Sequence, residues 1–163
     1  MMPYKATAVA NKFLEVATGK GARVSPMKLQ KLIYFAQGWA LAIVGRPLVE
    51  DAIQAWQYGP VVPDVYHAFK RFGSGTIGEP AKEFDLDSFE FVTPSVPSDD
   101  VEAIKLIKRI WEVYGDYSAM KLSQMTHAKD SPWDKTYDAG SGRAVIDEDV
   151  MREYFRSLAG EAA

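Results

Sequence analysis

The sequence Ser25-Pro26-Met27-Lys28-Leu29-Gln30-Lys31-Leu32-Ile33-Tyr34-Phe35-Ala36-Gln37-Gly38-Trp39-Ala40-Leu41 predicts the helix around which the rest of the chain is arranged. Ser25 is a favourable N-cap because its hydroxyl can accept a hydrogen bond from a free backbone N–H of the first turn, and Pro26 is tolerated at the first helical position. Apolar residues then recur at helical spacing, namely Leu29, Leu32, Ile33, Ala36, Ala40 and Ile43, with Phe35 and Trp39 on one flank. This apolar arc is wider than that of a surface helix, so we predict a central helix over residues 26–44 that is packed on two or more sides.

Gly38 lies in the middle of this predicted helix. A mid-helix glycine costs about 1 kcal/mol relative to alanine. We therefore expect the backbone of a neighbouring segment to approach the helix closely at this position.

Further helices are predicted around the central one. Apolar periodicity and turn residues place them at residues 4–17, 63–71, 118–125 and 147–158, with a short helix beginning at Ser131. Another helix, with its apolar stripe between residues 101 and 114, should be capped by Ser98 or Asp99. Residues 48–58 are partly extended, and residues 76–97 form a loop or small hairpin that could pair with residues 53–56. The fold class is therefore mostly α: a single compact helical domain over residues 1–163, with at most a small β-hairpin or sheet.

Composition restricts the classes of function. The 163 residues carry a formal net charge of −3, which is unusual for a general nucleic-acid binder. The chain has no cysteine, which excludes disulfides, thiolate nucleophiles and cysteine metal sites and fits a cytoplasmic location. The N-terminal residues do not resemble a signal peptide, and no run of about 18 apolar residues predicts a membrane span.

Motifs for catalysis are missing from the sequence. The two histidines, His67 and His127, are far apart and lack the spacing of a metal site, so we expect neither a metal nor a cofactor. Asp64 could open a nuclease site, but no lysine follows an acidic residue at the two-residue spacing that such a site needs. Nucleophile elbows and phosphate-binding loops are also missing. These patterns predict that the protein is not an enzyme.

Aromatic residues are the candidates for a binding surface. The four tryptophans stand in apolar contexts and are expected in the core, although tryptophan is also common at binding hot spots. The Tyr58-Gly59-Pro60 sequence predicts a stiff turn, and the tyrosines have polar tips suited to a surface. The predicted partner-binding residues are Tyr58, Gly59, Pro60 and Tyr66, together with the helix face formed by Gln30, Tyr34 and Gln37.

Several of these segments carry a family resemblance. Residues 28–39 are one of them, and the others are Gly45-Arg46-Pro47-Leu48, Ala55-Trp56-Gln57-Tyr58-Gly59-Pro60-Val61-Val62-Pro63-Asp64-Val65-Tyr66 and His127-Ala128-Lys129-Asp130-Ser131-Pro132-Trp133. Together they resemble the two-part signature of the Panacea domain family, which includes SocA-type antitoxins and phage-associated proteins. The resemblance implies an antitoxin that binds and neutralises a cognate protein toxin. In some members the antitoxin is also an adaptor that delivers its toxin to the ClpXP protease, so a close relative would have a SocB-like toxin and ClpX as partners.

A DNA-binding transcriptional regulator of a mobile element or prophage is the alternative function. Residues 118–137 could form two short helices around a turn. The second of these helices would carry Asp130, Asp134 and Asp138 against two lysines, and this balance of charge would repel phosphates. A small basic patch of Lys105, Lys108 and Arg109 is more typical of a solvated helix face.

Overall fold

A computed structural model describes residues 2–160 and confirms the predicted central helix. Helix α2 (Pro26–Trp39) begins at Ser25, whose hydroxyl accepts a hydrogen bond of 3.2 Å from the Lys28 N–H. The helix continues as a five-residue π-helical turn, η1 (Ala40–Val44). Gly45 ends it with a φ of 88°, and its N–H donates to the Ala40 carbonyl. A left-handed glycine is the usual way to end a helix.

The other helices, except α1, begin at side-chain caps or at proline. They are α1 (Ala6–Gly19), α3 (Pro63–Phe69) with the 3-10 turn η2 (Lys70–Phe72), α4 (Val101–Tyr114), α5 (Ala119–Thr126), α6 (Pro132–Thr136) and α7 (Glu148–Leu158). Ser118, Ser131 and Asp147 cap α5, α6 and α7. The predicted cap of α4 is wrong, because Asp100 and not Ser98 or Asp99 accepts the N–H of Ala103.

The extended segments form two small antiparallel sheets. In the first, β1 (Gln54–Trp56) lies between β2 (Gly59–Val61) and β5 (Ala144–Val145), with Trp56 opposite Gly59 and Gln54 opposite Val145. In the second, β3 (Glu83–Asp85) pairs only with β4 (Glu90–Val92). The hairpin predicted within residues 76–97 is therefore confirmed, but its pairing with residues 53–56 is wrong. Strand β1 takes its partners from β2 and from the distant β5.

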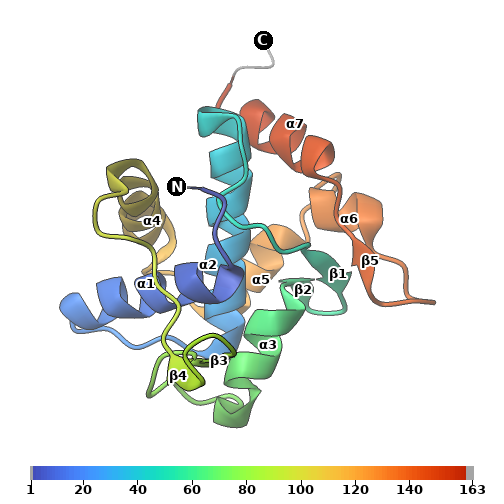
Figure 1. Ribbon diagram of the computed structural model, residues 1–163. Coiled ribbons are helices and arrows are strands. Elements are labelled where there is room, and N and C mark those ends of the chain that lie inside the picture. The colour runs from blue at the N-terminus through green and yellow to red at the C-terminus, as the bar shows by residue number, and fades with distance from the viewer. Residues whose placement is uncertain (1, 161–163) are drawn as a thin grey trace.

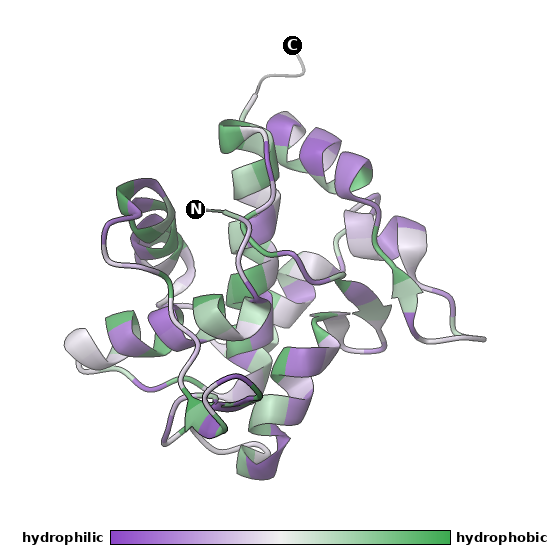
Figure 2. Cartoon of the chain, viewed as in Figure 1, coloured by the Kyte–Doolittle hydropathy of each residue, from purple (hydrophilic) through white to green (hydrophobic). Residues whose placement is uncertain are grey.

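Helix α2 lies at the centre of the molecule, with α1, α4, α5 and α7 packed around it (Figure 1). All residues from Leu29 to Gly38 are buried, which agrees with an apolar arc that is covered on several sides. Figure 2 shows that hydrophilic residues predominate on α7, whose buried residues are Met151 and Phe155. Ile43 departs from the prediction: it is 67% exposed, because the π-helical turn shifts it out of the register of the apolar stripe.

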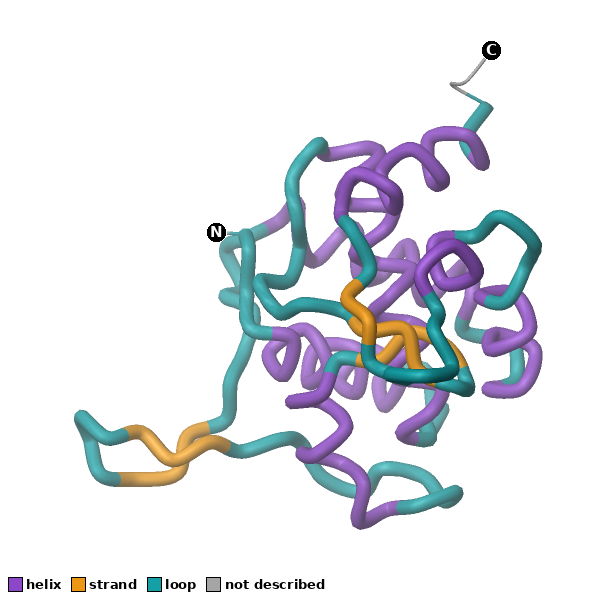
Figure 3. The backbone as a smooth tube through the Cα atoms, turned by 90° about the vertical axis from the view of Figure 1, so that its right-hand side faces the viewer, coloured by secondary structure: helices purple, strands orange, loops and turns teal. Residues whose placement is uncertain are grey.

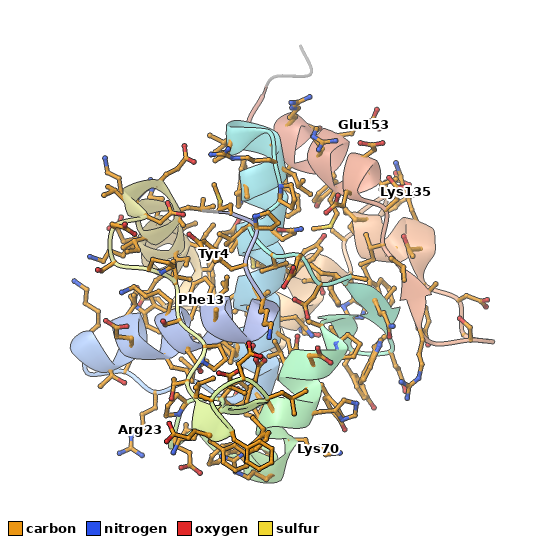
Figure 4. The ribbon with its side chains drawn as sticks, in the orientation of Figure 1. Tyr4, Phe13, Arg23, Lys70, Lys135 and Glu153 are labelled. Atoms are coloured by element: carbon orange, nitrogen blue, oxygen red, sulfur yellow. The ribbon has the colours of Figure 1, made fainter. Side chains whose placement is uncertain are left out.

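The N-terminal segment is tied to the centre of the chain. The N–H of Tyr4 donates to the Leu48 carbonyl, the N–H of Glu50 donates to the Tyr4 carbonyl, and the Tyr4 hydroxyl donates to Asp100. Tyr4 and Phe13 lie between α1 and α4 (Figure 4). One connected hydrophobic core links all these elements. Residues 1 and 161–163 belong to the predicted domain but lie outside the described part of the chain. Within residues 2–160 no helix has the length and apolarity required to cross a membrane.

Gly38 lies where a side chain of α7 packs directly against the backbone of α2. A Cβ atom built on Gly38 would lie 2.1 Å from a ring carbon of Phe155, which is fully buried. The prediction that a neighbouring backbone approaches closely here is wrong, because the atoms nearest to Gly38 belong to the Phe155 side chain. Phe155 packs edge-on against Tyr34, Phe35 and Trp39, so the missing side chain of Gly38 lets one phenyl ring enter the aromatic cluster of α2.

We predict that Gly38→Ala destabilises the protein by about 3 kcal/mol, because the added methyl group forces the Phe155 ring and α7 away from α2. Gly19→Ala is the matched control: Gly19 is also helical, but nothing lies within 4 Å of the position that its methyl group would occupy. This control should be neutral or up to about 1 kcal/mol more stable. Urea unfolding of both variants measures the effect, and equal midpoints would contradict the packing at Gly38.

Candidate partner-binding surface

Polar side chains on the buried surface of α2 bind the backbone of the extended segments that cross it. The Gln37 side-chain carbonyl accepts from the N–H groups of Leu48 and Val49 at 2.8 and 3.0 Å, and its amide donates to the Val49 carbonyl at 3.2 Å. Gln30 binds Val62 in the same way. Its side-chain carbonyl accepts from the Val62 N–H at 2.9 Å, and its amide donates to the Val62 carbonyl at 3.1 Å. Each glutamine thus satisfies backbone groups that a buried irregular segment would otherwise leave unpaired.

Lys31 is the buried cation of this surface. Lys31 is 2% exposed, and its ammonium group donates a hydrogen bond to the Pro60 carbonyl at 3.2 Å. No carboxylate within residues 2–160 pairs with it. Burial therefore lowers the pKa of Lys31 to about 7. Gly59, with a φ of 119°, leaves room for this side chain, because a Cβ at Gly59 would lie 2.8 Å from the Lys31 Cε.

The turn between β1 and β2 is held from its other side by residues of α5 and α6. The Trp133 indole N–H donates to the Trp56 carbonyl at 2.6 Å, and the Ser123 hydroxyl donates to the Tyr58 carbonyl at 2.8 Å. The His127 Nε2 lies 3.2 Å from the Gln57 carbonyl. Three consecutive carbonyl groups of the turn are therefore fixed by side chains, and the two segments that resemble the family signature meet at this point.

An aromatic groove lies on the outer side of the same turn. Tyr58 is 65% exposed and Tyr66 is 41% exposed. Tyr66 packs edge-on against Trp56 with ring centroids 5.0 Å apart, and the Arg143 guanidinium lies 5.0 Å from the Trp56 ring centre. The groove has a volume of about 420 Å³, and its lining consists of Pro26, Met27, Gln30, Lys31, Trp56, Gln57, Tyr58, Val61, Tyr66, Lys70 and Gly73.

The lining gives the groove an apolar and cationic character. It includes no carboxylate, although the chain as a whole is acidic. Of its two lysines only Lys70 is exposed, because Lys31 is buried and its pKa is lowered to about 7. Lys70 lies at the outer end of α3, where its side chain is exposed (Figure 4). A groove whose backbone is held in place, and whose aromatic side chains are bordered by a cation, can bind an acidic or aromatic segment of a partner protein.

The structure separates the predicted binding residues into two groups. Tyr58, Gly59, Pro60 and Tyr66 lie at or next to the groove, with Gly59 and Pro60 buried in strand β2 behind the exposed Tyr58. The turn itself is formed by Gln57 and Tyr58, one residue earlier than predicted, because Gly59 already pairs with Trp56.

The predicted exposure of the helix face formed by Gln30, Tyr34 and Gln37 is wrong. These residues are 5%, 1% and 2% exposed, because other elements cover α2 on this side as well. The Tyr34 ring packs against Phe35 and Phe155. Gln30 and Gln37 hold the backbone of neighbouring segments, and Gln30 also reaches the wall of the groove.

Sequence reasoning misses three contributors to the groove. Trp56 is predicted in the core, but it is half-buried and forms a wall of the groove. Trp39 and Trp133 are also half-buried, whereas Trp111 is buried as predicted. The other two contributors to the groove are Lys31 and Lys70, which are not among the predicted binding residues.

A larger hollow of about 690 Å³ lies between α1 and the segments at residues 77–80 and 93–96. It contains none of the predicted binding residues, and its lining mixes lysine, arginine and glutamate side chains with apolar ones. Within residues 2–160 no group of three or more histidine, aspartate and glutamate side chains is placed to hold a metal ion. The aromatic groove is therefore the surface on which predicted residues and geometry agree.

Comparison with known proteins identifies the family of the chain. Residues 29–134 match the family model described as "Antitoxin SocA-like, Panacea domain". The chain is also similar to Antitoxin SocA of Caulobacter vibrioides, with 36% identity over 156 residues that cover 93% of this chain and 82% of that protein. No solved structure matches the chain. The family match includes β1, β2, α3 and most of α2, which are the elements that form the groove.

The buried Lys31 predicts how stability depends on pH. Its pKa falls from the ordinary value of 10.5 to about 7 on folding. Between these values the unfolded chain binds more protons than the folded one, so the free energy of unfolding rises with pH. We expect Lys31→Met to remove this part of the pH dependence, which amounts to about 2 kcal/mol between pH 7 and 9.

Urea unfolding of the parent and of Lys31→Met at several pH values between 7 and 9 measures this difference. The Lys28 pKa is also lowered by burial, but Lys28 is present in both proteins and its effect cancels in the comparison. At pH 7 the variant should be at least as stable as the parent, because methionine fills a similar volume without a buried charge. Parallel pH profiles for the two proteins would show that Lys31 is hydrated or paired in the fold.

Proposed function

The chain belongs to the SocA-like Panacea domain family, and from this premise we propose that it is an antitoxin that binds and neutralises a protein toxin. The supporting observation is that the segments matched by the family build a preformed groove with exposed aromatic side chains. In this role the working part of the protein is a surface, and no residue is catalytic. The location that fits this role is the bacterial cytoplasm.

The fixed backbone of the groove supports binding. The side chains of Gln30, Lys31, Ser123 and Trp133 hold the carbonyl groups around the turn, so Tyr58 projects from a rigid support. A surface that is already ordered loses less conformational entropy when a partner binds. We place the toxin on this groove, with Tyr58 and Tyr66 as direct contacts and Gly59 and Pro60 as the support behind them.

The charge of the groove indicates the chemistry of the toxin segment. Lys70 and Arg143 border the aromatic rings, and no carboxylate contributes to the lining. A toxin segment that carries acidic and apolar side chains would match this surface. Such a segment also explains why an antitoxin of net charge −3 has a cationic patch at this position.

We predict that Tyr58→Ala and Tyr66→Ala keep the melting temperature of the parent within a few degrees but lose binding to the toxin and protection of cells. The probe is the product of the neighbouring gene, coexpressed with each variant and tested by pull-down and by growth. Tyr117→Ala is the matched control, because Tyr117 is 40% exposed and lies outside the groove.

Two results would contradict parts of this proposal. If the parent neither binds nor protects, the antitoxin role fails for this chain. If the parent protects and both tyrosine variants protect equally well, the toxin binds at another surface. Salt-dependent binding of the purified protein to duplex DNA would favour a regulator of transcription instead.

The proposal extends to the fate of the toxin. We propose that the protein also acts as an adaptor that delivers the bound toxin to the ClpXP protease. In cells that contain the antitoxin, the toxin should then be short-lived when ClpX is present and long-lived when ClpX is depleted. A toxin that is equally stable in both cases, with growth still protected, identifies a simple neutraliser.

A further inference from the structure

The hairpin β3–β4 projects from the body of the protein (Figure 3). It carries a group of exposed apolar side chains, namely Phe84, Leu86, Phe89, Phe91 and Val92, which are between 41% and 79% exposed. The rings of Phe89 and Phe91 pack edge-on against Phe84 with centroids 5.1 and 5.2 Å apart. The three phenyl rings form a cluster outside the core, and a cluster of this kind marks an interaction site.

The pairing of the strands gives the hairpin two different faces. Phe84 lies opposite Phe91, and the next pair along the ladder is Asp85 opposite Glu90. Neighbouring pairs in a ladder face opposite sides of the sheet, so the aromatic side chains share one face and these carboxylates share the other. Figure 2 shows hydrophobic and hydrophilic residues side by side on β4.

Two of the three carboxylates on the acidic face, Asp85 and Glu90, have no ion-pair partner within residues 2–160, whereas Glu83 is paired with Lys5. Like charges directly opposite each other destabilise an antiparallel pair. The Asp85 carboxylate accepts hydrogen bonds from the N–H groups of Asp87 and Ser88 in the turn, whereas Glu90 is exposed. The hairpin therefore offers a negative site for a cationic group from outside the chain.

Phe89 adds a conformational observation. Its φ is 60°, which is the left-handed region that glycine or asparagine adopts readily and a bulky side chain does not. If the only role of this residue were to close the turn, glycine would be more favourable at this position, because glycine adopts a positive φ without strain. The phenyl ring at this strained position is 76% exposed, so its position is not explained by burial in the core. Strained residues of this kind are concentrated at binding sites.

From these observations we propose that the hairpin β3–β4 is a second docking element, which inserts into an apolar cleft of a protein partner bordered by lysine or arginine side chains. The three phenyl rings fill the cleft, and its cations neutralise Asp85 and Glu90. A second copy of the chain is a poor occupant, because two hairpins packed through their aromatic faces would leave Asp85 and Glu90 on the outer faces without a cation. Nucleic acid is excluded as the partner by the same negative charge. This surface is separate from the aromatic groove and does not depend on the proposed function.

The test uses peptides selected from a random displayed library against the immobilised full-length protein, with counter-selection against the variant Phe89→Gly. The selected peptides should combine lysine or arginine with apolar residues, and their affinity for the parent should fall as salt is added. Phe89→Gly and Glu90→Lys should each weaken binding by at least about tenfold, as measured by calorimetry.

The two variants separate binding from folding. Phe89→Gly removes the strained conformation together with the ring, and Glu90→Lys turns the like-charge pair with Asp85 into an opposite pair. Both variants should therefore melt at or above the temperature of the parent while they lose the peptides. Glu153→Lys on α7 is the matched control for charge, because it changes the net charge equally at an exposed position far from the hairpin (Figure 4). This control should bind the peptides as the parent does.

Three outcomes overturn the proposal. The first is a selection that returns no binder, or only acidic peptides. The second is equal affinity of the selected peptides for the parent and for both hairpin variants. The third is self-association of the parent in sedimentation that Phe89→Gly abolishes, because a second copy would then cover the aromatic face. Loss of toxin binding by the Tyr58 variant, with peptide binding unchanged, would establish that the two surfaces act independently.

Discussion

The structure depends on hydrogen bonds between buried polar side chains of α2 and the backbone of the segments that cross it. A buried stretch of irregular chain carries N–H and C=O groups that no regular helix or sheet satisfies, and each unpaired group costs about 1–3 kcal/mol. Gln37 supplies the missing partners for Leu48 and Val49, and Gln30 supplies them for Val62. The central helix is therefore both the hydrophobic centre of the fold and the support for its extended segments.

Lys31 shows the energetic cost of this arrangement. A buried ammonium without a carboxylate is unfavourable, and the lowered pKa of Lys31 expresses that cost. The ammonium nevertheless binds the Pro60 carbonyl directly behind the exposed Tyr58, and Trp133 and Ser123 hold the neighbouring carbonyls from the opposite side. The fold accepts an unfavourable buried charge at the position where it fixes the turn that carries the aromatic groove.

The groove and the hairpin differ in their support from the core and in their charge. The groove beside Tyr58 and Tyr66 is cationic and is supported by the core. The hairpin β3–β4 is acidic, lies at the periphery and is joined to the rest of the protein mainly through the contacts of Glu83 with Lys5 and Thr7. If both surfaces bind partners as proposed, their opposite charges let each surface reject a partner suited to the other, which is a source of specificity.

The sequence by itself determined the mostly helical fold, the extent of the central helix and the residues of the groove that stand on the turn, because these features follow from local spacing and capping. Ser25 and Pro26 define the start of α2, and Gly45 defines its end. The family was also accessible from sequence, since its signature is contiguous within short segments.

Only the tertiary structure decided that no face of α2 between Leu29 and Gly38 is free. A helix that is covered on every side has no solvent-facing stripe, so the polar residues Gln30, Tyr34 and Gln37 looked like a surface although all three are buried. The partner of β1 was equally hidden, because β5 lies far along the chain and its two residues have no strand pattern of their own. The exposure of Phe84, Phe89 and Phe91 also required the fold, since the pattern of apolar residues in a strand does not tell whether a core lies beside it.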